Sequence, residues 1–175
     1  MLILNMKKVI LGATGSIGSS LAKKLVNSGE QIHLVGRDEV SLSELANELN
    51  STFTTCDVLE ENFSEKIVND LKDEQVNGLA YCVGSIDLKP LKLTKKSDFM
   101  QSFNLNLVCA TEIIKSLADN LKTNKGSIVL FSTVAVQQGF PNHAIVSSAK
   151  GAVEGLTLAL AAEYAPNIRV NCIAP

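Results

Sequence analysis

The stretch Lys7–Gly18, KKVILGATGSIG, places a short apolar run directly before three glycines, and a helical pattern starts at its end. Glycines in such a turn allow a tight bend, close approach of the backbone to a pyrophosphate and close packing of helix on strand. The phosphates would face free N–H groups at the helix N-terminus. The stretch predicts a dinucleotide-binding turn, with a plain glycine-rich turn as the alternative. The expected cofactor-binding residues here are Gly12, Thr14, Gly15, Ser16, Ile17 and Gly18.

Short apolar runs alternate with longer amphipathic ones along the rest of the chain. Most short runs are rich in Val, Ile and Leu without strict alternation, which is typical of strands buried on both faces of a parallel sheet. The predicted strands are Lys7–Ala13, Gln31–Gly36, Thr52–Cys56, Val76–Gly84, Gly126–Ser132 and Ile168–Ala174. The predicted helices include Ser16–Ser28, Asp98–Leu121 and His143–Ala165, with two shorter ones around residues 42–49 and 63–71. This order predicts an α/β fold of the Rossmann type, a doubly wound parallel sheet of six strands with helices on both faces.

Composition narrows the class of protein further. The 175 residues are 46% hydrophobic and carry a net charge of −2, which fits one domain and gives no sign of a nucleic-acid partner. The four cysteines lie far apart with no C-x-x-C pair, so we expect free thiols in a reducing compartment and no metal site. The N-terminal MLILNM is too short for a signal peptide, and we find no run near the ~20 apolar residues that cross a membrane. We therefore expect a cytoplasmic protein without a membrane partner, whether it starts at Met1 or at Met6.

The end of the second predicted strand bears on the choice of cofactor. An NAD site favours a carboxylate there, which accepts a hydrogen bond from the ribose 2′-hydroxyl. Here Gly36 and Arg37 occupy the tip, and an arginine can pair with a 2′-phosphate. Asp38 comes next and is interpreted as a turn or cap residue of the following helix. The pattern favours NADP(H) over NAD(H). The alternative is that Arg37 is an ordinary surface charge.

With these motifs in place, the chain resembles the short-chain dehydrogenase/reductase family over essentially its whole length. Several ordered motifs are far more specific than any one of them. They are Gly12–Gly18, Cys56-Asp57-Val58, Gly84, Asn106, Ser132–Ala135, Ser147–Val153 and Ile168–Pro175. The resemblance implies an NAD(P)(H)-dependent oxidoreductase that transfers a hydride between NADP(H) and a carbonyl or alcohol. It also implies a small-molecule substrate and a homo-dimer or homo-tetramer.

The resemblance assigns roles to residues beyond the glycine turn. Asp57 and Val58 are expected to contact the adenine, by side chain and backbone respectively. Gly84 would let the chain pass close to the cofactor ribose. Lys150 would bind the nicotinamide ribose and lower the pKa of a neighbouring acid.

The catalytic part of the family pattern is broken at one position. Asn106 stands where the family holds a water of the proton relay, and Thr133 stands where it has a substrate-orienting serine. The proton donor of the family is a tyrosine four residues before the lysine, but residue 146 is valine. Tyr81 also departs from the family, because Tyr81–Gly84 stands where Asn-Asn-Ala-Gly is usual. The binding motifs are thus present in altered form, whereas the general acid is missing from its usual place.

Another residue could replace the missing acid. Positions i, i+3 or i+4, and i+7 share one face of a helix, so His143, Val146 or Ser147, and Lys150 form one stripe. An imidazole can release a proton near neutral pH, which makes His143 a candidate catalytic residue. The alternative is an exposed helix start with no catalytic role, and Ser147 is a weaker candidate acid.

Three functions are compatible with this pattern. The first is an oxidoreductase with a displaced acid, and the second is a catalytically impaired NADP(H)-binding pseudoenzyme that acts as a sensor or as a regulatory or assembly subunit. The third, a purely structural subunit, has no need for the cofactor motifs. The apolar stretch Val153–Tyr164 favours an oligomer, since a helix that is apolar on more than one face must be covered on more than one face. The alternative is that Glu154, Thr157 and Glu163 mark a sufficient solvent face. The family continues beyond Pro175, so we expect residues 1–175 to be a single domain that lacks its substrate loop and last strand.

Overall fold

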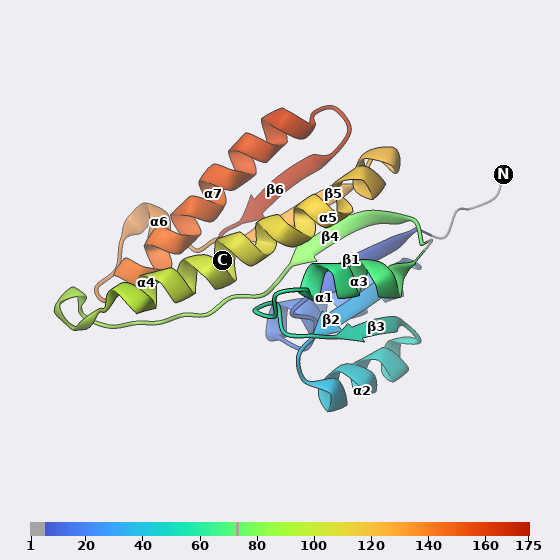
Figure 1. Cartoon of the computed structure of the whole chain (residues 1–175), viewed down its shortest axis with the longest axis horizontal. Helices are drawn as coiled ribbons and strands as arrows, with labels where there is room; N and C mark the ends of the chain where they lie inside the picture. Colours follow the sequence, from blue (N-terminus) through green and yellow to red (C-terminus); the bar gives the residue numbers. More distant parts are fainter. Residues whose placement is uncertain (1–5, 73) are drawn as a thin grey trace.

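The computed structural model describes residues 6–72 and 74–175, and these contain a parallel sheet with the strand order β3-β2-β1-β4-β5-β6 (Figure 1). The strands are β1 (Lys7–Leu11), β2 (Gln31–Gly36), β3 (Thr52–Thr55), β4 (Val76–Tyr81), β5 (Ser127–Phe131) and β6 (Arg169–Ile173). The order reverses between β1 and β4, which is the position where such sheets bind ligands. The predicted Rossmann-type fold is confirmed. The stretch 1–5, which holds the Met1 start and part of the segment weighed as a signal peptide, lies outside the described residues.

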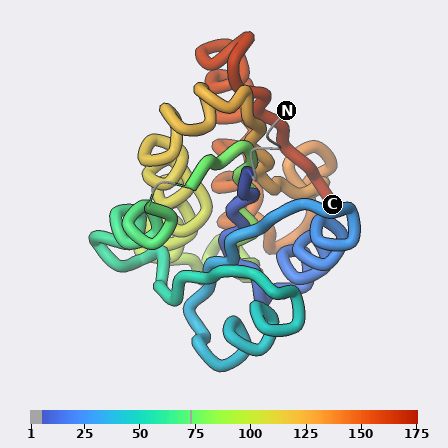
Figure 2. Tube along the Cα trace, turned by 90° about the vertical axis from the view of Figure 1, so that its right-hand side faces the viewer, coloured from blue at the N-terminus to red at the C-terminus, as the bar shows by residue number. Residues whose placement is uncertain are grey.

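Helices cover both faces of the sheet. Helices α1 and α2 pack on one face, whereas α3, α5 and α7 pack on the other, as the end view of Figure 2 shows for α1, α3 and α5. The helices are α1 (Ser16–Asn27), α2 (Glu39–Leu49), α3 (Phe63–Leu71), η1 (Leu91–Leu93), α4 (Lys96–Phe103), η2 (Asn104–Val108), α5 (Cys109–Thr123), α6 (Ala135–Gln138) and α7 (Ala144–Tyr164).

Strand β1 contributes side chains to the hydrophobic cores on both faces of the sheet. Successive side chains of a strand point to opposite faces. Val9 and Leu11 join the core beneath α3, α5 and α7, whereas Ile10 joins the core beneath α1 and α2. All three side chains are fully buried. An uninterrupted apolar run is therefore the expected pattern over Val9–Leu11, because neither face of the strand meets water there.

Five of the six predicted strands were too long at their carboxyl ends, whereas Gln31–Gly36 matches β2. Strand β1 ends at Leu11 rather than Ala13, and β4 ends at Tyr81 rather than Gly84. The residues that follow are still apolar or glycine, so hydropathy alone extends the strand through them. In the fold these residues lie beyond the ends of the strands, and Gly12 and Cys82–Gly84 line the pocket described below.

The long helix predicted over 98–121 is interrupted. Helix α4 ends at Phe103, the π-helical turn η2 follows, and α5 begins at Cys109. A π turn inserts one residue into the helical repeat and is frequent at functional sites. Asn106 lies inside this turn.

Helix α7 is long and apolar enough to cross a membrane, judged by length and composition only. This corrects the statement that no run of the sequence approaches that length. In the fold, α7 packs against β5, β6 and η2, so it acts here as a covering helix of the sheet.

The four cysteines are free thiols, as predicted; Cys56 and Cys109 are buried, and Cys82 and Cys172 are half-buried.

The imidazole of His33, in β2, is a buried polar group that lies between the hydroxyls of Thr52 and Thr54, at 2.8 and 2.9 Å. Burial, with a smaller contribution from Lys7, lowers the pKa of His33 to about 4, so this imidazole is neutral at pH 7.

Candidate active site

The glycine turn between β1 and α1 has no room for side chains at two positions. Gly12 has a φ of +72°, and a Cβ there would lie 2.9 Å from the carbonyl carbon of Cys82. A Cβ on Gly18 would lie 2.2 Å from the carbonyl oxygen of Gly12. Gly15 precedes α1 as its N-cap and offers no side-chain cap to the first N–H groups of the helix. The turn therefore brings the backbone close to β4 and leaves donors at the helix N-terminus for an anion.

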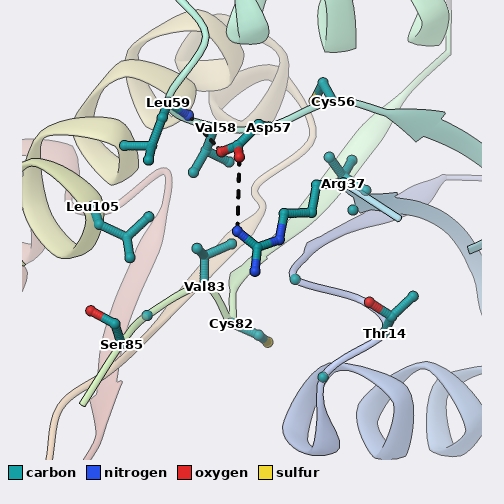
Figure 3. A pocket seen from close by; sticks show the side chains of 15 residues that line it. Thr14, Arg37, Cys56, Asp57, Val58, Leu59, Cys82, Val83, Ser85 and Leu105 are labelled. Atoms are coloured by element: carbon teal, nitrogen blue, oxygen red, sulfur yellow. Dashed lines mark hydrogen bonds and ion pairs between the residues drawn. The ribbon is translucent and has the colours of Figure 1, made fainter. Parts of the chain in front are cut away.

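A pocket of about 350 Å³ lies beyond the carboxyl ends of β1 to β4 (Figure 3). It brings together residues that the sequence analysis singled out from four separate segments. The predicted residues in its lining are Gly12, Thr14, Gly15, Arg37, Asp57, Val58 and Gly84. Leu59, Cys82, Ser85 and Leu105 also line it and were not predicted. The signal that could have found Cys82 and Ser85 is their place directly after β4, at the switch point of the sheet.

Arg37 and Asp57 face one another across the pocket. Arg37 follows β2, and its Nη1 lies 3.9 Å from Oδ2 of Asp57, as the dashed line in Figure 3 shows. The Arg37 side chain is 80% exposed, so it is free to reorient toward a ligand. Asp57 also accepts a hydrogen bond from the Leu59 N–H at 3.0 Å. The predicted cap role of Asp38 is confirmed, because its carboxylate accepts from the N–H and the hydroxyl of Ser41.

A second pocket of about 270 Å³ adjoins the first, and Cys82–Ser85 line both. Of the expected catalytic residues it holds Thr133, His143 and Lys150, but no carboxylate of a described residue lines it. Ile17 lines this pocket rather than the first one. Ser16 and Gly18 line neither, so Gly18 acts through helix packing. Within the described ranges, no group of three or more His, Cys, Asp or Glu side chains could hold a metal ion.

Three predicted residues converge where the two pockets meet. A Cβ on Gly84 would lie 2.8 Å from Oδ1 of Asn106 and 3.2 Å from Nζ of Lys150. The side chain of Asn106 is buried, and its Nδ2 donates to the Ser102 carbonyl at 2.9 Å. Its Oδ1 has no hydrogen-bond partner among the described residues. A buried acceptor without a partner is costly, so this oxygen is placed to receive a donor from a ligand or a water.

Lys150 lies on the inner face of α7, close to the end of β4. The structure records no hydrogen bond or ion pair for its Nζ within residues 6–72 and 74–175. Burial lowers the pKa of the Lys150 ammonium below its usual range. Burial likewise raises the pKa of the neighbouring Cys82 thiol to about 12, so Cys82 is a neutral thiol and not a nucleophile. The Lys150 ammonium is therefore poorly solvated and available to a polar ligand.

The predicted stripe on α7 faces the second pocket in part. His143, Val146 and Lys150 line the pocket together, and Val146 is 3% exposed. Ser147 instead donates its hydroxyl to the Ala135 carbonyl at 3.2 Å. Thr133 lines the same pocket, and its Oγ1 accepts a weak hydrogen bond from the Ala135 N–H at 3.3 Å.

The imidazole of His143 has a defined orientation. Its Nδ1 lies 2.8 Å from the carbonyl oxygen of Pro141, and its ring packs against Phe140 with centroids 5.4 Å apart. A carbonyl can only accept, so Nδ1 carries the hydrogen and Nε2 is the nitrogen that can exchange a proton.

Comparison with known proteins agrees with this arrangement. A family model described as Enoyl-(Acyl carrier protein) reductase matches residues 12–175. L-Fucose dehydrogenase of Oryctolagus cuniculus is 31% identical over 172 residues, which is 95% of this chain and 61% of the relative. L-Xylulose reductase of Bos taurus is 30% identical over 175 residues, 97% of this chain and 70% of the relative. A solved short-chain dehydrogenase/reductase family protein has the same fold, with a TM-score of 0.91 at 24% identity over 100% of this chain and 75% of its own.

These likenesses cover the glycine turn, both pockets and the helix that carries Lys150. The chain spans 61% of the length of the fucose dehydrogenase, so the comparison concerns the part of that protein that it matches. The chain belongs to the short-chain dehydrogenase/reductase family, a family of oxidoreductases that use NAD(P) cofactors.

Proposed function

We propose that the protein is an NADP(H)-dependent oxidoreductase that transfers a hydride between NADP(H) and a carbonyl or alcohol substrate. The observation that carries the proposal is the convergence of Asn106 and Lys150 over Gly84, at the junction of two adjoining pockets. A cofactor site and a substrate site must meet where the hydride passes. Residues 1–175 are proposed to act as a single NAD(P)-binding domain.

The residues present fit a dinucleotide. Gly12 and Gly18 form a cradle that a Cβ would fill, and the α1 N-terminus beside it suits a pyrophosphate. Asp57 and Val58 line the adenosine end of the pocket, and Gly84 opens the other end toward Lys150. When bound, the nicotinamide supplies or accepts the hydride. Lys150 would hold the hydroxyls of its ribose, and the free Oδ1 of Asn106 would anchor a relay water.

The proton donor must be a residue other than Val146. The aliphatic Val146 cannot donate, and His143 lines the same pocket with Nε2 as its exchangeable nitrogen. A protonated His143 would donate to a carbonyl oxygen during reduction, and the neutral form would accept from an alcohol during oxidation. The hydroxyl of Thr133, which lines the same pocket, would orient the substrate oxygen.

Replacing His143 with alanine tests this assignment. Turnover of the best substrate in a panel of aldehydes and ketones is expected to fall about 10²–10⁴-fold, the usual contribution of a positioned acid. Affinity for NADPH, measured by calorimetry, is expected to stay unchanged. Ser148→Ala is the matched control, since this exposed hydroxyl bonds only within its own helix. Undiminished turnover in His143→Ala would refute the role, and tight NADPH binding without any turnover in the unaltered protein would favour the pseudoenzyme.

Replacing Arg37 with glutamine tests the cofactor preference. A charged hydrogen bond to the 2′-phosphate is worth about 1.5–3 kcal/mol, so NADPH affinity is expected to fall about 10–100-fold while NADH affinity hardly changes. Arg169→Gln is the matched control, because Arg169 begins β6 and lines neither pocket. Equal affinities of the unaltered protein for NADPH and NADH would contradict the preference.

We also propose a homo-dimer or homo-tetramer in the cytoplasm. The support for assembly is the apolar outer face of α7, where Leu158 is 74% exposed. A monomeric mass at micromolar concentration would contradict the assembly.

A further inference from the structure

We propose that Tyr81 is a positioning residue whose hydroxyl holds the π-helical turn η2 and thereby aims Asn106 at the junction of the two pockets. The inference rests on the proposed function for the meaning of that junction. Tyr81 stands at a position where the family pattern has asparagine. None of the roles assigned above uses it.

Tyr81 makes one specific contact with the turn. It is the last residue of β4, its side chain is 3% exposed, and its hydroxyl donates to the carbonyl oxygen of Leu105 at 2.7 Å. Burial raises the pKa of this phenol far above its usual range. The hydroxyl therefore keeps its proton and remains a donor throughout the pH range in which the enzyme would work.

The Leu105 carbonyl that Tyr81 contacts is one whose helical hydrogen bond is changed by the π turn. In an α-helix the N–H of Cys109 would bond to the carbonyl of Leu105, four residues earlier. Here that N–H bonds to the carbonyl of Asn104, five residues earlier. The tyrosine hydroxyl thus supplies a donor to a carbonyl whose α-helical partner has been diverted, which stabilises the π turn against a regular α-helix.

The turn matters because Asn106 is the next residue. A regular helix through this segment would change the rotational register of Asn106 relative to α5. Its Oδ1 would then leave the position, 2.8 Å from a Cβ on Gly84, at which it approaches Lys150. Two residues at the end of β4 therefore set the position of Asn106. Tyr81 holds the turn that carries it, and Gly84 leaves the space into which it points.

Tyr81→Phe removes the hydroxyl and keeps the ring, and Tyr164→Phe is the matched control. Tyr164 is the other tyrosine, lies at the end of α7, and has no recorded hydroxyl hydrogen bond in the described part of the chain. In Tyr81→Phe the Asn106 side-chain amide signal in ¹H–¹⁵N NMR is expected to move, and amides 105–110 are expected to exchange with solvent at least tenfold faster. The control variant is expected to leave both unchanged. An unmoved Asn106 signal with unchanged exchange in Tyr81→Phe would overturn the proposal.

Steady-state kinetics distinguish a role of Tyr81 in positioning Asn106 from a role in the stability of the fold alone. We expect kcat to fall about tenfold in Tyr81→Phe, with KM and the NADPH dissociation constant within twofold of the unaltered protein. Equal kcat values, or a loss confined to KM, would overturn the inference. If the unaltered protein turns over no carbonyl, the proposed function fails, and the Asn106 signal still decides whether Tyr81 positions it.

A measurement on the unaltered protein covers the case in which Tyr81→Phe does not fold. With ¹³Cζ-labelled tyrosine in equal parts H₂O and D₂O, a hydroxyl held in a buried hydrogen bond exchanges slowly and gives two resolved Cζ signals. Two signals for Tyr81 and one averaged signal for Tyr164 would support the contact. One averaged signal for Tyr81 would overturn it.

Discussion

Lys150→Met is expected to reduce turnover by about 10²–10³-fold or more, because it removes the only lysine or arginine among the described residues that line the second pocket. Nζ of Lys150 lies beside Asn106 and Gly84, where the two pockets meet. Methionine fills a similar volume but donates no hydrogen bond. The affinity for NADPH is expected to fall as well, because Lys150 would hold the nicotinamide ribose. Steady-state kinetics and calorimetric titration with NADPH measure the two effects.

The same variant is expected to unfold at a higher temperature than the unaltered protein. Burial lowers the pKa of Lys150, which means that the folded state disfavours its charged form and that the ammonium costs stability at pH 7. An apolar side chain removes this cost. Lys24→Met is the control, since Lys24 is exposed on α1. A loss of activity that accompanies a large fall in melting temperature would show damage to the fold rather than to the site.

Gly18→Ala is expected to remove cofactor binding and to destabilise the fold. The added Cβ would lie 2.2 Å from the carbonyl oxygen of Gly12 and 2.9 Å from the Cα of Ala13, so helix α1 must move away from β1. Overpacking of this kind typically costs about 1–3 kcal/mol. The movement also displaces the N-terminus of α1 from the pyrophosphate position. NADPH at 100 times its dissociation constant stabilises a protein by about 2.7 kcal/mol, and this stabilisation is expected to vanish.

The control for Gly18→Ala is Gly155→Ala. Gly155 also lies within a helix, α7, and a Cβ there meets no atom within 4 Å. Alanine favours the helix by up to about 1 kcal/mol over glycine, so this variant should keep NADPH binding and melt slightly higher. If Gly18→Ala bound NADPH as the unaltered protein does, the turn would not be the pyrophosphate site.

The local motifs of the cofactor site were predictable from the sequence. The glycine turn at 12–18 is recognisable because each glycine meets a steric need within a few residues of its position. Arg37 was predicted from its place at the end of the second predicted strand, and Asp57 from the resemblance to the family; strand ends meet at one edge of a parallel sheet. The fold brings both into one pocket and places them 3.9 Å apart.

The shape of the segment around Asn106 was not predictable in the same way. Hydrophobic periodicity indicates a helix, but a single inserted residue shifts the pattern too little to reveal a π turn. The hydrogen bond between Tyr81 and Leu105 joins residues 24 positions apart, and nothing in the sequence pairs them. The stripe of His143, Val146 and Lys150 was predicted from spacing alone, whereas its direction depended on how α7 packs against the sheet.

The sequence alone therefore determined the order of strands and helices, the glycine cradle and the absence of tyrosine at position 146, because these depend on local conformation and residue type. The tertiary structure decided which side chains share a pocket, which acceptor is left without a partner, and how Tyr81 contacts the turn that carries Asn106. These features depend on packing between distant segments. Asn106 Oδ1 and Lys150 approach one another only because β4, η2 and α7 meet at the switch point of the sheet.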